Sequence, residues 1–179
     1  MPSFQRFRIK PRLRVSELVQ QLFQVFVIDD ERSLVGLDRA QIEANSRFRA
    51  EVFERQRLTY LIASIALAIT SNEKTHKATA EIARCFRAVA SAELLRRWPN
   101  DQDSIDLEIE QAAQDLAKLV FTDPSNDRGL SYDWARDWLL RVGIVETNPA
   151  TLFMFSTRWK NHFISAAKFI SGVRVADLF

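Results

Sequence analysis

Apolar residues recur with a helical period over most of the chain. The clearest segment runs from about Lys77 to Trp98, where an apolar residue stands at every fourth position. These positions are Ile82, Phe86, Ala90, Leu94 and Trp98. Residues four apart lie on one face of an α-helix, so the pattern predicts an amphipathic helix with a buried face. Pro99 is expected to end it, because proline cannot continue the helical hydrogen bonds.

Three other segments before residue 122 also have helical character. A helix capped by Ser16 is expected to continue to about Ile28, and another is expected from about Asp38 to Thr70, with Ser46 as a place where it can break. Within the second of these, Leu58 to Ile69 is apolar nearly all round, which predicts burial on every side. Twelve helical residues span only about 18 Å, which is too short for a bilayer core. A further helix is expected from about Ser104 to Phe121.

The last third of the chain has a mixed pattern. Ser131 is expected to cap a short helix that ends at Leu140, with Gly143 as its C-cap. Two β-prone runs, 144–146 and 151–155, flank four turn residues and predict a hairpin, with residues 7–15 as its third strand. A helix over about 157–170 would close the unit. This order is similar to the back half of a winged helix-turn-helix module, which implies that the helix before the hairpin is the recognition helix.

These elements predict a mainly α fold, a multi-helix bundle with a small C-terminal winged-helix-like α+β unit. The expected organisation is a basic extended arm or edge strand over 1–15, a helical domain over 16–121 and the winged-helix-like module over 122–179. Hydrophobic residues make up 47% of the chain and charged residues 27%, which is typical of a globular protein rather than a disordered one.

The N-terminal arm carries the densest positive charge. Its basic residues alternate with mostly apolar ones, which is the two-residue period of a strand, and no acid occurs among the first sixteen residues. The basic residues are Arg6, Arg8, Lys10, Arg12 and Arg14. Pro11 limits the segment to an edge strand or an extended arm. Such an arm can follow a phosphate backbone, or its charge can simply protect an edge strand from aggregation.

The sequence offers little for catalysis. It has no Gly-x-Ser-x-Gly motif, no glycine-rich phosphate loop and no Cys-x-x-Cys pair. Glu73 and His76 have the spacing of two ligands on one helix face, but a di-metal site needs a second such pair. The other histidine, His162, has Trp159 three residues before it, at the position where the second carboxylate would be required. We therefore expect no metal and no cofactor, and the balance of the observations is against an enzyme.

Two further residues invite a chemical interpretation. Cys85, the single cysteine, lies on the apolar flank of its helix and is interpreted as a buried small hydrophobic residue rather than a reactive thiolate. With no disulfide available and no apolar run of signal-peptide length after the N-terminus, a cytoplasmic location is expected. Glu93 falls within the apolar stripe and needs a partner, for which Arg96 and Arg97 are the local candidates.

Two functions remain open. The first is a non-enzymatic helical adaptor that contacts another protein or a second copy through Tyr132, Arg136 and Trp159. The alternative is a nucleic-acid-binding protein, either a regulator or a subunit of a nucleic-acid-processing complex. It would use the basic arm together with Arg158, Lys160 and Lys168. The expected recognition helix mixes acids with bases, which favours protein contacts, because acids are repelled by the phosphates beside a groove.

Overall fold

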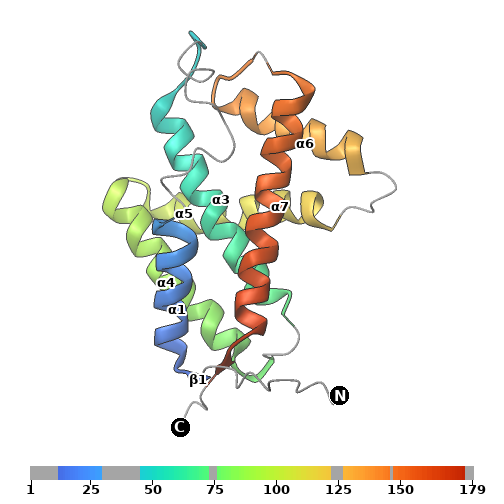
Figure 1. Ribbon diagram of the computed structural model, residues 1–179. Helices are drawn as coiled ribbons and strands as arrows, with labels where there is room; N and C mark the ends of the chain where they lie inside the picture. Colours follow the sequence, from blue (N-terminus) through green and yellow to red (C-terminus); the bar gives the residue numbers. More distant parts are fainter. Residues whose placement is uncertain (1–11, 30–44, 73–75, 122–126, 146, 176–179) are drawn as a thin grey trace, which may run out of the picture.

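The computed structural model describes residues 12–29, 45–72, 76–121, 127–145 and 147–175. These residues form a mainly helical fold with one very small sheet (Figure 1). The α-helices are α1 (Val15–Phe23), α3 (Ala50–Thr70), α4 (His76–Arg97), α5 (Gln102–Val120), α6 (Asp127–Arg141) and α7 (Pro149–Ser171). A π-helical turn, η1 (Gln24–Ile28), continues α1. No helix in the described ranges is long and apolar enough to cross a membrane.

The first helix begins two residues earlier than the sequence suggested. Arg14 is the N-cap, and its backbone N–H donates to Oε2 of Glu17 at 2.8 Å. The expected cap, Ser16, is the second residue of the helix. The prediction was wrong because a glutamate in the first turn satisfies a free N–H as well as a serine cap does. The predicted end near Ile28 is confirmed once η1 is included.

The long α3 lies at the centre of the fold. Its apolar run is buried as predicted, apart from the half-buried Ala66 and Leu67. The helix begins at Ala50, after a turn in which the Phe48 N–H donates to the Asn45 carbonyl at 3.0 Å. The helix therefore does not extend back through Ser46, while the expected helical start near Asp38 lies outside the described residues. The predictions for α4 and α5 match to within two residues.

The predicted hairpin is wrong. A single helix, α7, begins at Pro149 and includes the whole of 151–155. Asn148 caps it by accepting a hydrogen bond from the Thr151 N–H at 2.8 Å, so the Asn-Pro pair starts a helix instead of making a turn. Leu152 and Phe155 follow with helical spacing and are buried on one face, and this tertiary burial outweighs their β propensity. The winged-helix-like unit is therefore not confirmed.

The helix before α7 is also longer than expected. It begins at Asp127, so Ser131 is a buried residue inside α6 and not its cap. Its predicted C-cap is confirmed, since Gly143 has a positive φ of 86°. Ile144 follows as a buried residue in the short connection to α7.

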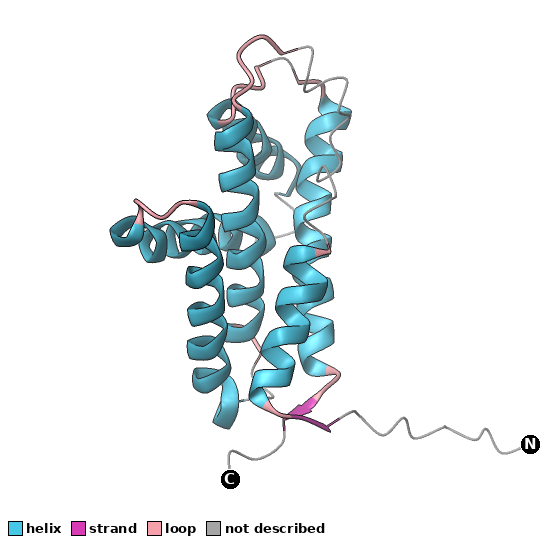
Figure 2. Cartoon of the chain, turned by 90° about the vertical axis from the view of Figure 1, so that its left-hand side faces the viewer, coloured by secondary structure: helices cyan, strands magenta, loops and turns pink. Residues whose placement is uncertain are grey.

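In the described part of the chain the sheet consists of two strands, β1 (Arg12–Leu13) and β2 (Arg174–Val175). They run parallel, with Arg12 opposite Arg174 and Leu13 opposite Val175. The predicted strand over 7–15 is therefore confirmed only at two residues, and these pair with Arg174–Val175 and not with a hairpin. Val15 already belongs to α1, and residues up to 11 lie outside the described part. Figure 2 shows the ladder at one end of the bundle, where it joins the start of α1 to the end of α7.

Two hydrophobic clusters make up the core, and α3 and α7 pass through both. The first joins α1, the later part of α3, α4 and the later part of α7. The second joins the earlier part of α3, α5, α6 and the earlier part of α7, and it contains Trp138 and Trp159. The segment predicted as a C-terminal module, 122–179, therefore shares its core with the helices that precede it.

Candidate functional site

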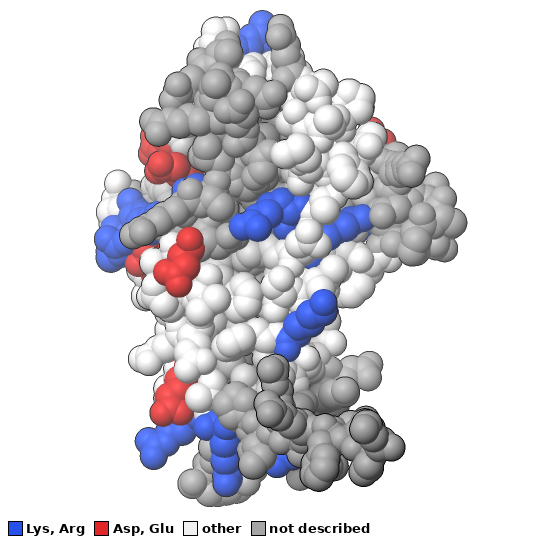
Figure 3. Space-filling model, in the orientation of Figure 1, with Lys and Arg blue, Asp and Glu red and all other residues white. Residues whose placement is uncertain are grey.

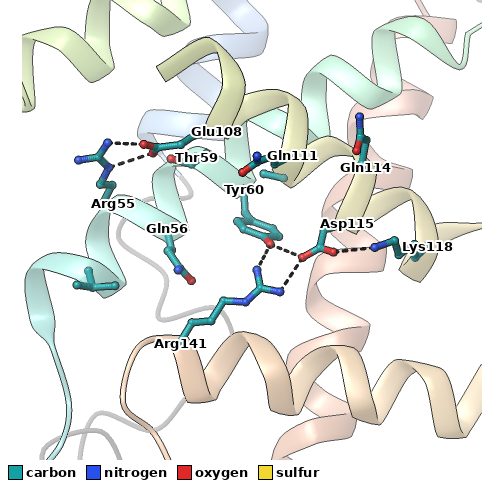
Figure 4. A pocket seen from close by; sticks show the side chains of 12 residues that line it. Arg55, Gln56, Thr59, Tyr60, Glu108, Gln111, Gln114, Asp115, Lys118 and Arg141 are labelled. Atoms are coloured by element: carbon teal, nitrogen blue, oxygen red, sulfur yellow. Dashed lines mark hydrogen bonds and ion pairs between the residues drawn. The ribbon is translucent and has the colours of Figure 1, made fainter. Parts of the chain in front are cut away.

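A polar cleft of about 470 Å³ opens between α3, α5 and the C-terminal end of α6 (Figure 4). Arg55, Gln56 and Tyr60 reach it from α3, while Glu108 and Asp115 reach it from α5. Positions 56 and 60 are one turn apart and so share one flank of α3, and the bond from Tyr60 to Asp115 shows that this flank faces α5. The cleft combines charged, amide and hydroxyl groups on three helices that are distant in sequence.

One side of the cleft is a closed hydrogen-bonded triangle. The Tyr60 hydroxyl donates to Oδ2 of Asp115 at 2.8 Å and accepts from Nη1 of Arg141 at 3.0 Å. The third edge is the ion pair between Arg141 Nη2 and Asp115 Oδ2 at 3.1 Å. Lys118 adds a contact of 3.3 Å to the other carboxylate oxygen. This triangle ties α3, α5 and α6 together.

The triangle also determines the charge states of its members. Burial and the hydrogen bond to Asp115 raise the pKa of Tyr60, so its hydroxyl stays protonated. Burial opposes ionisation of Asp115, but hydrogen bonds from Tyr60 and the charge of Arg141 outweigh it and lower the pKa of this carboxyl. The site is therefore a neutral phenol held between a carboxylate and a guanidinium.

The other side of the cleft is organised by Arg55. Its Nε and Nη2 atoms donate to the two carboxylate oxygens of Glu108 at 3.0 and 2.5 Å, and Nη1 also contacts Asp101. The hydrogen bond to Glu108 is the main reason why the pKa of Arg55 is raised. The guanidinium carbon lies 5.8 Å from the centre of the Trp98 ring, which favours the same position.

The charges of the cleft are largely satisfied by each other. Every cation that lines it is paired with a carboxylate, and its described lining residues include neither histidine nor cysteine. Two buried atoms, Oε1 of Gln56 and Oγ1 of Thr59, have no hydrogen-bond partner among the described residues. Nor do the described residues bring three acids, histidines or cysteines together as metal ligands. The arrangement is suited to holding helices together and offers little to a charged ligand.

Glu93 behaves as its position in the sequence suggested, while Cys85 is half-buried beside the first hydrophobic cluster and not fully buried as expected. Burial, together with a contact between Sγ and Glu81, raises the pKa of the Cys85 thiol, which opposes thiolate formation. Glu93 accepts hydrogen bonds from Arg96 and Arg97 at 2.7–2.9 Å, and these partners lower its pKa to about 2. The predicted ion pair at the end of α4 is confirmed.

Two of the predicted basic residues, Arg12 and Arg14, lie at the end of the molecule that carries the two-stranded ladder. Arg12 and Arg14 are exposed at the start of α1, and the strand pairing places Arg12 beside the exposed Arg174. The other three members of the arm, Arg6, Arg8 and Lys10, lie outside the described residues. Arg12 and Arg174, which are far apart in the sequence, thus lie opposite each other in the two-stranded ladder.

Helix α7 continues this positive charge along the bundle. At about 100° per residue, Arg158, Lys160 and Lys168 fall within an arc of about 160° on the side of α7 away from Trp159. Lys168 is exposed, while Arg158 and Lys160 are half-buried, with the Lys160 Nζ donating to Ser131 Oγ at 3.1 Å. The sequence from 147 to 176 contains no acid. Figure 3 shows Lys and Arg side chains from the middle to the lower end of this face, with acidic side chains mainly toward its left edge.

The residues predicted to bind a protein partner differ in their exposure to solvent. Arg136 is exposed and paired with Asp133 at 3.2 Å, and Tyr132 is half-buried. Trp159 is 0% exposed, so its assignment to a contact surface is wrong. It packs against Tyr60 and Trp138 because its helical position points into the core.

Sequence reasoning missed the triangle and the position of Arg174 beside the arm. Tyr60, Asp115 and Arg141 follow no shared motif, and their elements meet only through long-range packing. Comparisons with protein-family models, with curated proteins and with solved structures find no match to this chain.

Proposed function

We propose that this protein binds nucleic acid through a basic strip on α7 and the two-stranded ladder. The strip consists of Arg12, Arg14, Arg158, Lys160, Lys168 and Arg174. The observation that carries the proposal is the parallel pairing of Arg12 with Arg174. This pairing joins the basic arm to the end of a helix that contains no acid.

The dimensions of the strip suit a phosphate backbone. Arg158 and Lys168 are ten residues apart on one helix, or about 15 Å, and the ladder extends the positive charge beyond Lys168. Duplex DNA carries one negative charge per about 1.7 Å of its axis, so a strip of this length faces several phosphates. Contacts of this kind are independent of sequence, and they weaken as salt concentration rises.

The proposal differs from a recognition-helix mechanism in where the contact is made. The acids of α6 include Asp133 and Asp137, both exposed, and they disfavour insertion of that helix between phosphates. The acid-free α7 has no such obstacle. A general affinity for nucleic acid, with little base readout, is the expected result.

A salt titration of binding tests the proposal. The variant replaces four exposed members of the strip, Arg12, Arg14, Lys168 and Arg174, with Gln. Binding to labelled duplex and single-stranded oligonucleotides is measured by fluorescence anisotropy between about 50 and 200 mM salt. The slope of log K against log salt should fall by about three to four units on duplex DNA, because each duplex phosphate contact contributes about 0.9.

A matched control neutralises the same number of charges elsewhere. Arg84, Arg87, Arg96 and Arg136 are exposed and lie on α4 and α6. Their replacement by Gln should leave the salt slope nearly unchanged. Equal losses in both variants, or no binding by the wild type at low salt, would contradict the proposal. Binding to anionic vesicles alone would assign the strip to a membrane surface instead.

A second candidate, the protein adaptor, is favoured by a different observation. Phe153 and Met154 are 55% and 54% exposed at the start of α7, close in sequence to the exposed Leu140 and Val145. Exposed large apolar side chains, when they share a surface, are typical of a contact with another protein. Sedimentation velocity over a range of concentrations tests self-association. A dimer that the Phe153→Ser, Met154→Ser double variant abolishes would support it, and a monomer throughout would count against it.

A further inference from the structure

An apolar groove runs beside the basic strip. It has a volume of about 490 Å³ and is formed by the end of α3, the C-terminal half of α7 and Phe121, the residue that follows α5. Phe163, Ile164 and Ala167 supply apolar lining from α7, and Lys168 lines the same groove with a positive charge. The groove is thus a mainly apolar recess whose lining also includes Ser71, Asn72 and Ser171 and the positive charge of Lys168.

Phe121 is the unusual residue of this groove. Its side chain is 59% exposed, although a phenyl ring at a helix end can usually be covered by neighbouring side chains. The Phe121 ring packs edge to face against the Phe163 ring, with the ring centres 5.7 Å apart and the planes at 81°. Ile164 is also exposed, at 42%, in the same groove. Together they form an open aromatic and aliphatic platform.

Lys168 lies at one end of this platform, whereas Lys160, whose Nζ donates to Ser131 Oγ at 3.1 Å, lies further toward the start of α7 and does not line the groove. Lys160, Ile164 and Lys168 are spaced i, i+4 and i+8, so they follow one line along the helix, with the two lysines about 12 Å apart. The order along the line is positive, apolar, positive.

We infer that this groove receives an unpaired base, so that the nucleic acid bound by the strip is single-stranded. Bases of a duplex are stacked inside it and cannot reach a recess beside α7, whereas unpaired bases stack on exposed aromatic rings. The positive charge of Lys168, which lines the groove and belongs to the proposed basic strip, favours this occupant over an apolar peptide, which would gain nothing from that charge. The inference rests on the proposed function and adds the substrate class to it.

Three substitutions of Phe121 separate stacking from simple apolar contact. Phe121→Ala should weaken binding to a single-stranded oligonucleotide roughly 5- to 150-fold, which is the range for loss of one stacked base. Binding to a duplex of equal length should change by less than about twofold. Phe121→Trp should retain single-strand affinity because indole also stacks, while Phe121→Leu should lose most of it.

Leu107→Ala is the matched control, since Leu107 is exposed on α5 and does not line the groove. It should bind both oligonucleotides like the wild type. Thermal unfolding of every variant checks that the fold is kept, which is expected because the Phe121 side chain is mostly exposed.

The outcomes distinguish this inference from the proposed function. If Phe121→Ala weakens single-strand and duplex binding equally, or Phe121→Leu binds as well as the wild type, the groove does not hold a base. If Phe121→Ala has no effect while the four-fold Gln variant still weakens binding, the basic strip stands and the inference is overturned. If the wild type binds no oligonucleotide at low salt, both are overturned.

Discussion

Gly143 lies directly against the backbone carbonyl of Arg47. A Cβ added at Gly143 would overlap with that carbonyl, and the φ of +86° is one that side-chain-bearing residues rarely adopt. Nearby, the Arg49 N–H donates to the Val142 carbonyl at 3.0 Å, so the turn after α6 is fastened to the segment before α3. Close approach of two backbones therefore requires glycine here.

Gly143→Ala is accordingly expected to destabilise the protein by about 2 kcal/mol or more, because the turn must shift to admit the methyl group. Urea unfolding gives the value. Gly172→Ala is the control, since Gly172 has a right-handed helical backbone and its added Cβ would lie 3.3 Å from the nearest carbonyl oxygens. A loss at Gly172 as large as that at Gly143 would contradict this explanation.

Ile65→Asp should prevent stable folding. Ile65 is fully buried in the first hydrophobic cluster, and an unpaired carboxylate there costs several kcal/mol, which is comparable to a total stability of about 5–15 kcal/mol. Circular dichroism and thermal unfolding measure the effect. Ile65→Val is the control and should cost only about 0.5–1.5 kcal/mol. A cooperative transition of Ile65→Asp at the wild-type temperature would show that this part of the core is wrongly assigned.

Tyr60→Phe should destabilise the protein by about 1–2 kcal/mol. It removes the hydroxyl that bridges Asp115 and Arg141 but keeps the ring that packs against Trp138. The free energy of unfolding of Tyr60→Phe is measured by denaturant titration, with Tyr132→Phe as the control. The Tyr132 hydroxyl makes no hydrogen bond within the described residues, so its loss should cost less than about 0.5 kcal/mol. Equal stabilities of the two variants would mean that the triangle contributes nothing to the fold.

The ion pairs of Glu93 should make stability depend on pH in acid. The pKa of Glu93 is lowered to about 2, chiefly by its hydrogen bond from Arg96, from an ordinary value of 4.5. A lowered pKa means that the unfolded chain binds the proton first. The stabilisation is therefore complete above about pH 4.5 and is lost as pH falls toward 2.

Glu93→Gln removes this contribution. At pH 7 the variant should be less stable than the wild type by about 1–2 kcal/mol, and the difference should shrink to near zero by about pH 2. Unfolding by urea at several pH values checks it, with Glu110→Gln, at an exposed position on α5, as the control. A difference that stays constant from pH 7 to 2 would rule out ionisation of Glu93 as its source.

Prediction from the sequence succeeded where one helix carries its own pattern. The four-residue period of α4 predicts one buried face, and the all-round apolar run of α3 predicts burial on every side. Both predictions need only the spacing of apolar residues along one helix. The pairing of Glu93 with Arg96 and Arg97 was predictable for the same reason, since residues three and four apart meet on a helix.

Prediction failed where a local preference and a long-range contact disagree. Residues 151–155 have β-prone side chains, but a helix buries Phe155 against Trp138 and Trp159, and this burial stabilises the helix. Asn148 and Pro149 are equally good as turn residues and as a helix start, so their identity could not decide between the two. The polar cleft was missed because its members come from three helices.

Local sequence patterns were enough to predict a mainly helical chain, the buried apolar run of α3 and an N-terminal segment that is basic and free of acids. No local pattern predicted that Arg12 lies opposite Arg174, that Tyr60 joins Asp115 to Arg141, or that Phe121 and Lys168 line the same groove. The physical reason is distance along the chain. The spacing of apolar residues shows which side of a helix is buried. The contacts between helices depend instead on how all the buried faces pack together in the folded chain.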